Sequence, residues 1–139
     1  MKFLEALERC ADPVEPEVWN QLGGGEGLSP EFVDFMQQWG GCAIFEEWIE
    51  INGLGFTRFL GGGSGANTVE FEWGLLDENL RHYLPFASND YGGQFFLHSV
   101  DGSVWYANVQ TAQEDGAGGQ IAVSFPAFLE LLETSVGSE

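Results

Sequence analysis

The sequence predicts an α+β fold, in which helices pack against an antiparallel or mixed sheet of about five to six strands. Two observations support this prediction. Helical patterns stand near both ends of the 139-residue chain, and short strand-like segments with hairpin spacing fill the part between them. Because the linkers between these segments are short, we expect residues 1–139 to form a single domain.

The N-terminal part of the chain is predicted to be helical. A first helix is expected from Phe3 to Cys10, ending before Asp12-Pro13 because the residue before a proline avoids the α region. A short helical turn is expected at residues 18–22. The clearest helix runs from Pro30 to Trp39, since Ser29 is a suitable N-cap and Gly40-Gly41 supplies a stop. One face of this helix is apolar, at Phe32, Phe35, Met36 and Trp39.

Short strands are predicted in the middle of the chain, with a last helix at its end. Alternating residues favour strands at Trp48–Leu54, Phe56–Leu60, Val69–Trp73 and Ile121–Val123. The glycine-rich residues 61–67 are typical of a surface loop. Residues 74–83, which follow the predicted strand Val69–Trp73, could equally form a helix. Ser124 is expected to cap a final helix with an apolar stripe at Phe125, Phe128, Leu129 and Leu132.

A β-hairpin is the strongest local signal. Segments Gln94–Val100 and Ser103–Val109 flank Asp101-Gly102, a pair of residues that suits a two-residue turn. Pairing about this turn sets Ser99 opposite Val104, His98 opposite Trp105, and Leu97 opposite Tyr106. One face is therefore expected to carry Phe95, Leu97 and Tyr106, and the other Phe96, His98 and Trp105.

The charge balance is strongly acidic. The chain has 22 Asp and Glu against 4 Lys and Arg, which gives a net charge of −18 and makes nucleic acid and anionic membranes poor partners. Disorder is excluded because 44% of the residues are apolar, with 12 Phe and 5 Trp. No signal peptide or membrane-spanning run stands out, so a cytoplasmic location is expected, with Cys10 and Cys42 reduced.

Catalytic and metal-binding patterns are weak. His82 and His98 are the only imidazoles, and neither lies in a zinc-binding spacing. Cys42 could act as a nucleophile with either histidine, but without a local signature a small core residue is the simpler interpretation. Close carboxylate pairs are expected by chance among 22 acids, so they carry little information about a glycosidase-like acid and base. We therefore predict no catalytic residue and no metal site.

The local density of acids is more informative than their pairing. The densest acids, which we take as candidate partner-binding residues, are Glu46, Glu47, Glu50, Glu70, Glu72, Asp77, Glu78 and Asp90. Two interpretations stay open: these residues form a solvated face, or they form a docking surface for a basic protein.

Two groups of residues in this chain recur in a known protein family. The first group is Leu28-Ser29-Pro30-Glu31-Phe32, Phe35-Met36 and Trp39-Gly40-Gly41. The second is Tyr83–Ala87, Asp90, Gly92-Gly93, Phe95–Leu97, Asp101-Gly102, Ile121-Ala122, Ser124-Phe125 and Phe128-Leu129. In order and spacing these residues resemble the SUKH superfamily, and the resemblance spans residues 28 to 132.

The SUKH superfamily contains bacterial immunity proteins of polymorphic toxin systems and fungal cell-wall-assembly regulators. The resemblance implies a helix-covered sheet, no cofactor and no catalysis. In bacteria it implies an immunity protein that binds and blocks a cognate toxin, often a nuclease with a basic surface. The alternatives are a non-catalytic scaffold or regulatory module and, from a different class, an enzyme that uses paired carboxylates.

Overall fold

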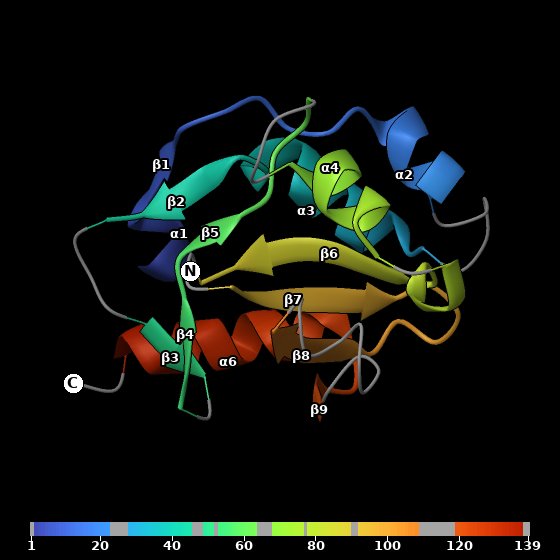
Figure 1. Cartoon of the computed structure of the whole chain (residues 1–139). Coiled ribbons are helices and arrows are strands. Elements are labelled where there is room, and N and C mark those ends of the chain that lie inside the picture. The colour runs from blue at the N-terminus through green and yellow to red at the C-terminus, as the bar shows by residue number, and fades with distance from the viewer. Residues whose placement is uncertain are drawn as a thin grey trace.

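The computed structural model describes residues 2–22, 28–45, 49–51, 53–63, 68–76, 78–89, 92–108 and 119–137 (Figure 1). Its elements in chain order are α1 (Lys2–Glu5), β1 (Leu7–Arg9), α2 (Pro16–Leu22), α3 (Pro30–Trp39), β2 (Cys42–Ile44), β3 (Ile49–Ile51), β4 (Leu54–Phe56), β5 (Arg58–Phe59), α4 (Val69–Gly74), the 3-10 helix η1 (Glu78–Leu80), β6 (Tyr83–Ser88), β7 (Gly93–His98), β8 (Val104–Asn108), β9 (Gly119–Ala122) and α6 (Phe125–Gly137).

One antiparallel sheet organises these elements. Within the described ranges it has seven strands in the order β1-β2-β5-β6-β7-β8-β9, and every neighbouring pair is antiparallel. Strands β3 and β4 form a separate hairpin that lies beside α6 (Figure 1). The predicted α+β class and antiparallel sheet are confirmed, and the sheet is somewhat larger than the five to six strands expected.

The predicted helix over residues 30–39 is confirmed as α3. The Ser29 Oγ accepts the Phe32 N–H at 3.2 Å, and Pro30 stands in the first turn. The helix ends at a glycine pair that packs against the segment after β1. Gly41 has a φ of 84°, and a Cβ there would lie 2.2 Å from the Ala11 carbonyl oxygen, so no other residue fits without a backbone shift.

Helices α3 and α6 cover one face of the sheet with aromatic side chains. The Phe32 ring of α3 meets Trp19, Phe125 and Phe86 edge to face, with ring centroids 4.9, 4.9 and 5.7 Å away. The final helix begins as predicted, because the Ser124 Oγ accepts a backbone N–H of its first turn at 3.2 Å. This aromatic cluster joins the helices to the strands and forms the main core.

A second, smaller core lies on the other face of the sheet. It contains Leu76, Leu80, Phe96 and Ala107, with Trp73, Tyr83 and Trp105 packed around it. The elements that supply this cover are α4, which contacts β6, and η1. The sheet is therefore covered on both faces around β6 to β8. Helix α4 lies on the second face, on the opposite side of the sheet from α3 and α6 (Figure 1).

Two predicted elements are wrong in type. The helix expected over Phe3–Cys10 stops at Glu5, because residues Leu7–Arg9 pair with β2 instead. The strand expected over Val69–Trp73 is the helix α4, with Thr68 as its N-cap. The alternation misled because the buried Val69 and the half-buried Trp73 are four residues apart, which is also a helical spacing.

Other strand boundaries differ from the prediction. The segment predicted as one strand at Trp48–Leu54 contains β3 and the start of β4, with Gly53 at φ 83° between them, whereas Trp48 itself lies outside the described residues. The segment Phe56–Leu60 is shared by the end of β4 and β5, and the last strand covers Gly119–Ala122 instead of 121–123. Of the loop at residues 61–67, only 61–63 are described.

The central hairpin has the predicted faces but a different register. Leu97 stands opposite Val104, two residues from the expected pairing, because four residues, Ser99 to Gly102, form the loop. The His98 carbonyl accepts the Gly102 N–H at 2.9 Å, and the His98 Nδ1 accepts the Val100 N–H at 3.2 Å. A shift of two residues preserves side-chain direction, so the predicted two faces of the hairpin are confirmed.

Candidate partner-binding surface

The structure separates the predicted acidic residues into different places. Glu46, Glu47, Asp77 and Asp90 lie outside the described residues. Glu50 is exposed on β3, which packs beside α6. Three other candidates lie on α4 and η1, the two elements that cover the opposite face of the sheet. These three are Glu70 and Glu72 of α4 and Glu78 of η1. The structure therefore groups three of the four described candidates.

The acids on α4 have a local structural role as well. Thr68 begins the helix, and its Oγ1 accepts the Phe71 N–H at 3.4 Å. Glu70 and Glu72 occupy the first turn, where negative charge is favourable beside the positive end of the helix dipole. Both carboxylates can therefore stabilise α4, with Glu70 exposed and Glu72 half-buried. Taken by themselves, these carboxylates are explained by a solvated helix face and require no partner.

Exposed apolar side chains distinguish this surface from a merely solvated face. Phe71 and Leu75 are 42% and 51% exposed, and they stand four residues apart near the end of a helix, which places them side by side. Solvated faces seldom hold two large apolar groups next to each other. We call Glu70, Phe71, Glu72, Leu75 and Glu78 the α4 surface. The sequence prediction missed Phe71 and Leu75, which only a helical reading of this segment places together.

Arg81 holds the C-terminal end of α4. Its Nη2 donates to the carbonyl of Gly74, the last residue of the helix, at 3.4 Å, and its Nε donates at 3.2 Å to the carbonyl of Leu76, two residues further on. The guanidinium carbon also lies 5.0 Å from the centroid of the Trp73 ring. This cation is therefore directed at backbone carbonyls and an aromatic face.

Arg9 has the same role at the end of α3. Its Nη1 donates to the Gly40 carbonyl at 3.0 Å and its Nη2 to the Gln38 carbonyl at 2.5 Å. Two of the four basic side chains of the protein therefore bind the negative ends of helices. Since the chain has 22 acids and 4 bases, ion pairs between side chains can compensate only a small part of its negative charge.

The histidines form an aromatic group and give no sign of a metal centre. The His82 and His98 rings lie 5.0 Å apart, and each also contacts the ring of Tyr83. Burial and the neighbouring His98 lower the pKa of His82. Across the described ranges, no three His, Cys, Asp or Glu side chains are grouped so that they could hold a metal ion.

The two cysteines have different environments. Both are free thiols; Cys10 is exposed, and Cys42 is buried at the start of β2. Burial raises the pKa of the Cys42 thiol, which disfavours the thiolate that a nucleophile needs. The geometry therefore favours Cys42 as a core residue.

Among the helices in the described part of the chain, none combines the length and the apolar character that crossing a bilayer requires.

Comparison with known proteins identifies the family. Neither the curated proteins nor the solved structures compared with the chain gave a match. Residues 20–131, well over half of the chain, match the sequence model of the SMI1 / KNR4 family, also called SUKH-1. This range includes the Ser29-capped helix, the Gly40-Gly41 pair and the central hairpin described above. The chain therefore belongs to the SMI1 / KNR4 family (SUKH-1).

Proposed function

We propose that this protein is an immunity protein, which binds a cognate bacterial toxin and neutralises it by forming a stoichiometric complex. The SUKH family includes toxin-immunity proteins and the fungal SMI1/KNR4 regulators, and its members are generally non-catalytic proteins that act through protein–protein interaction. Binding without catalysis is the mechanism that this membership supports for the present chain.

The acidic charge supports a basic partner. A toxin that cleaves nucleic acid must hold phosphate groups, so its cleft presents Lys and Arg side chains. A protein of net charge −18 is attracted to such a surface, and the attraction accelerates association. A nuclease toxin is therefore the partner class that fits this charge best.

The α4 surface carries the proposal. Stable interfaces combine an apolar centre, which excludes water, with a polar rim that sets orientation. Phe71 and Leu75 supply an exposed apolar pair, and Glu70, Glu72 and Glu78 supply negative charge around it. This combination matches a partner patch that has Lys or Arg side chains around an apolar spot.

The test uses the toxin encoded by the adjacent reading frame. The purified toxin and this protein are mixed at increasing ratios, and complex formation and toxin activity are measured at about 50 mM and about 500 mM salt. We expect a one-to-one complex, loss of toxin activity at equivalence, and association that slows steeply with salt. A toxin that remains fully active and unbound at low salt would contradict the proposal.

The regulatory role of the fungal relatives is the second candidate, because the matching family is described by those proteins. In that case the partners would be proteins of the host cell, and the adjacent reading frame would encode no toxin. Failure of the toxin assay together with a stand-alone gene would favour this second function.

A further inference from the structure

A pocket lies between the first turns of α3 and α6 and the loop that joins β7 to β8. Its volume is about 280 Å³. Apolar walls come from the hairpin and from α6, and two carboxylates complete the lining; the residues concerned are Leu97, Val100, Phe125, Pro126, Glu31 and Asp101. Small-molecule sites in proteins usually measure about 300–1,000 Å³, so this pocket suits a single side chain better than a cofactor.

The first turns of the two helices leave few donors for an anion. Helix N-termini usually attract negative groups through free backbone N–H groups. Here the hydroxyls of Ser29 and Ser124 each accept a backbone N–H of their own helix, and Pro30 and Pro126 have no N–H to offer. The dipole of each helix places about half a positive charge at its N-terminus, and the two carboxylates that line the pocket, with a full negative charge each, outweigh these partial charges, so a cation is the favoured occupant.

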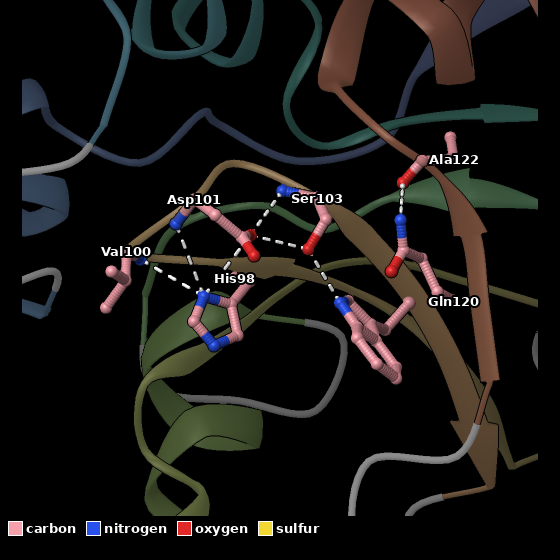
Figure 2. A network of polar contacts seen from close by, with 7 residues as sticks. His98, Val100, Asp101, Ser103, Gln120 and Ala122 are labelled. Atoms are coloured by element: carbon pink, nitrogen blue, oxygen red, sulfur yellow. Dashed lines mark hydrogen bonds and ion pairs between the residues drawn. The ribbon is translucent and has the colours of Figure 1, made fainter.

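Asp101 is held in place by the hairpin, as Figure 2 shows. Its Oδ1 accepts the Ser103 N–H at 2.9 Å and the Ser103 hydroxyl at 2.6 Å, while the Ser103 Oγ accepts the Trp105 Nε1–H at 2.7 Å. These hydrogen bonds lower the pKa of Asp101, so its carboxylate stays charged at neutral pH. All of the bonds end on Oδ1, and Oδ2 accepts none from the residues that the structure describes.

The second carboxylate and the pocket rim are open to solvent. Glu31 is exposed in the first turn of α3, and Val100 is 75% exposed at the tip of the hairpin. The hairpin loop is also joined to the segment that follows η1, since the Ser99 N–H donates to the His82 carbonyl at 2.8 Å. The pocket can therefore be reached by a protein that also contacts η1.

We propose that this pocket receives one arginine side chain of the partner protein. The aliphatic part of that side chain packs on Val100 and Phe125, and its guanidinium binds the carboxylates of Glu31 and Asp101. The assignment deepens the proposed function and rests on it, because a basic toxin supplies the arginine. A phosphate or nucleotide in the same pocket would face two negative charges.

The first experiment needs no toxin. The ¹⁵N-labelled protein is titrated with N-acetyl-arginine amide, and with N-acetyl-citrulline amide as the neutral isostere. We expect saturable shifts at the amides of Val100, Gly102 and Phe125 with arginine, and none with citrulline. Equal shifts with both compounds, or arginine shifts spread evenly over the acidic residues, would overturn the proposal.

Conservative variants then test the two carboxylates. The double variant Glu31→Gln and Asp101→Asn keeps the shape of both side chains, and the new amide oxygen at 101 can still accept from Ser103. We expect the dissociation constant for the arginine probe to rise about three- to tenfold, the loss typical of one or two exposed ion pairs. The matched control is the double variant Glu8→Gln and Glu130→Gln, which removes two negative charges at exposed positions away from the pocket and should leave binding unchanged. Equal effects in both would mean that net charge alone attracts the probe, and the pocket would be rejected.

The toxin complex separates this inference from the proposed function. If the toxin binds but the Glu31→Gln and Asp101→Asn variant dissociates no faster than the Glu8→Gln and Glu130→Gln control, the pocket is wrong and the function stands. If the arginine probe binds in the pocket and the toxin does not bind at all, the immunity function fails and the cation site remains.

Discussion

Trp73 contacts both the backbone and the side chain of Arg81. The Trp73 Nε1–H donates to the Arg81 backbone carbonyl at 2.8 Å, and the Arg81 guanidinium carbon lies 5.0 Å from the Trp73 ring centroid. The guanidinium nitrogens also donate to the carbonyls of Gly74, the last residue of α4, and Leu76, which follows it. This reciprocal contact ties the C-terminal end of α4 to the start of β6. The apolar pair of the α4 surface therefore stands on an anchored helix.

Loss of the Arg81 side chain should loosen α4. In Arg81→Met the stem remains, but the two carbonyls lose their donor and the ring loses its cation, so the free energy of unfolding should fall by about 1–2 kcal/mol. Arg81→Lys keeps the positive charge but lacks the planar guanidinium, so its free energy of unfolding should lie between those of the wild type and Arg81→Met. Urea unfolding followed by tryptophan fluorescence measures the change. A difference below about 0.3 kcal/mol for the methionine variant would contradict the anchoring role.

Charge reversal on the α4 surface should slow association with a basic toxin. We expect the triple variant Glu70→Lys, Glu72→Lys and Glu78→Lys to reduce the association rate about tenfold or more at low salt, with a smaller change in dissociation. The comparison variant reverses three exposed acids elsewhere, Glu8, Glu15 and Glu130, which gives the same net charge. Stopped-flow measurements that show equal rates for both triple variants would mean that no particular patch is used.

The exposed apolar pair should contribute to affinity more than to stability. Phe71→Ala with Leu75→Ala removes side chains that are already about half exposed, so we expect the free energy of unfolding to change by less than about 1 kcal/mol. The dissociation constant for the toxin should rise at least about tenfold, as for truncation of an interface centre. Val123→Ala, at a side chain that is 74% exposed outside the α4 surface, is the control and should change neither quantity. Titration calorimetry and thermal unfolding together check this prediction.

The pKa of Asp101 should depend on the Ser103 hydroxyl. The hydrogen bonds from Ser103 lower the pKa of Asp101 in the folded protein below its unfolded value of about 3.9. The ionised carboxylate therefore stabilises the fold at pH values above the unfolded pKa, and this stabilisation is lost as the pH falls through the folded pKa. In Ser103→Ala the pKa should rise toward its ordinary value, while Ser103→Thr should keep it low. Carboxyl NMR titration measures both, and an unchanged pKa in the alanine variant would contradict the assignment.

The two cysteines should react at very different rates. Cys10 is exposed, whereas Cys42 is buried and its pKa is raised by burial, so a thiol reagent such as DTNB should modify one thiol per native chain quickly. Both should react in guanidinium chloride. The Cys10→Ser variant should show no fast phase in the native state, and a fast phase that persists there would mean that Cys42 is accessible.

The elements predicted correctly are those whose signals are local. The helix at 30–39 and the final helix each begin at a serine whose hydroxyl caps the first turn, and their apolar stripes face the sheet. Caps and stripes act within a few residues, so adjacent sequence is sufficient to specify them. The two faces of the central hairpin follow from alternation in the same way.

Other features depend on contacts between distant residues. Leu7 to Arg9 are strand because they pair with β2, more than 30 residues away, and the hairpin register depends on the His98 ring and the Gly102 backbone that close a four-residue loop. The identity of α4 as a helix was likewise hidden, since Val69 and Trp73 fit either period. Only the tertiary structure shows that Val69 is buried in the main core and that Trp73 packs against both cores.

The sequence by itself determined the fold class, the family resemblance and the acidic character that favours a basic partner. Only the tertiary structure decided which carboxylates lie on the same side of the sheet. Glu50 and Glu70 are similar in the sequence, but β3 packs beside α6 and α4 packs on β6, so they lie on different sides of the sheet. Charge is a property of composition and the helical spacing of Phe71 and Leu75 is local, whereas the side of the sheet on which a helix or strand lies is decided by packing between residues that are distant in the sequence.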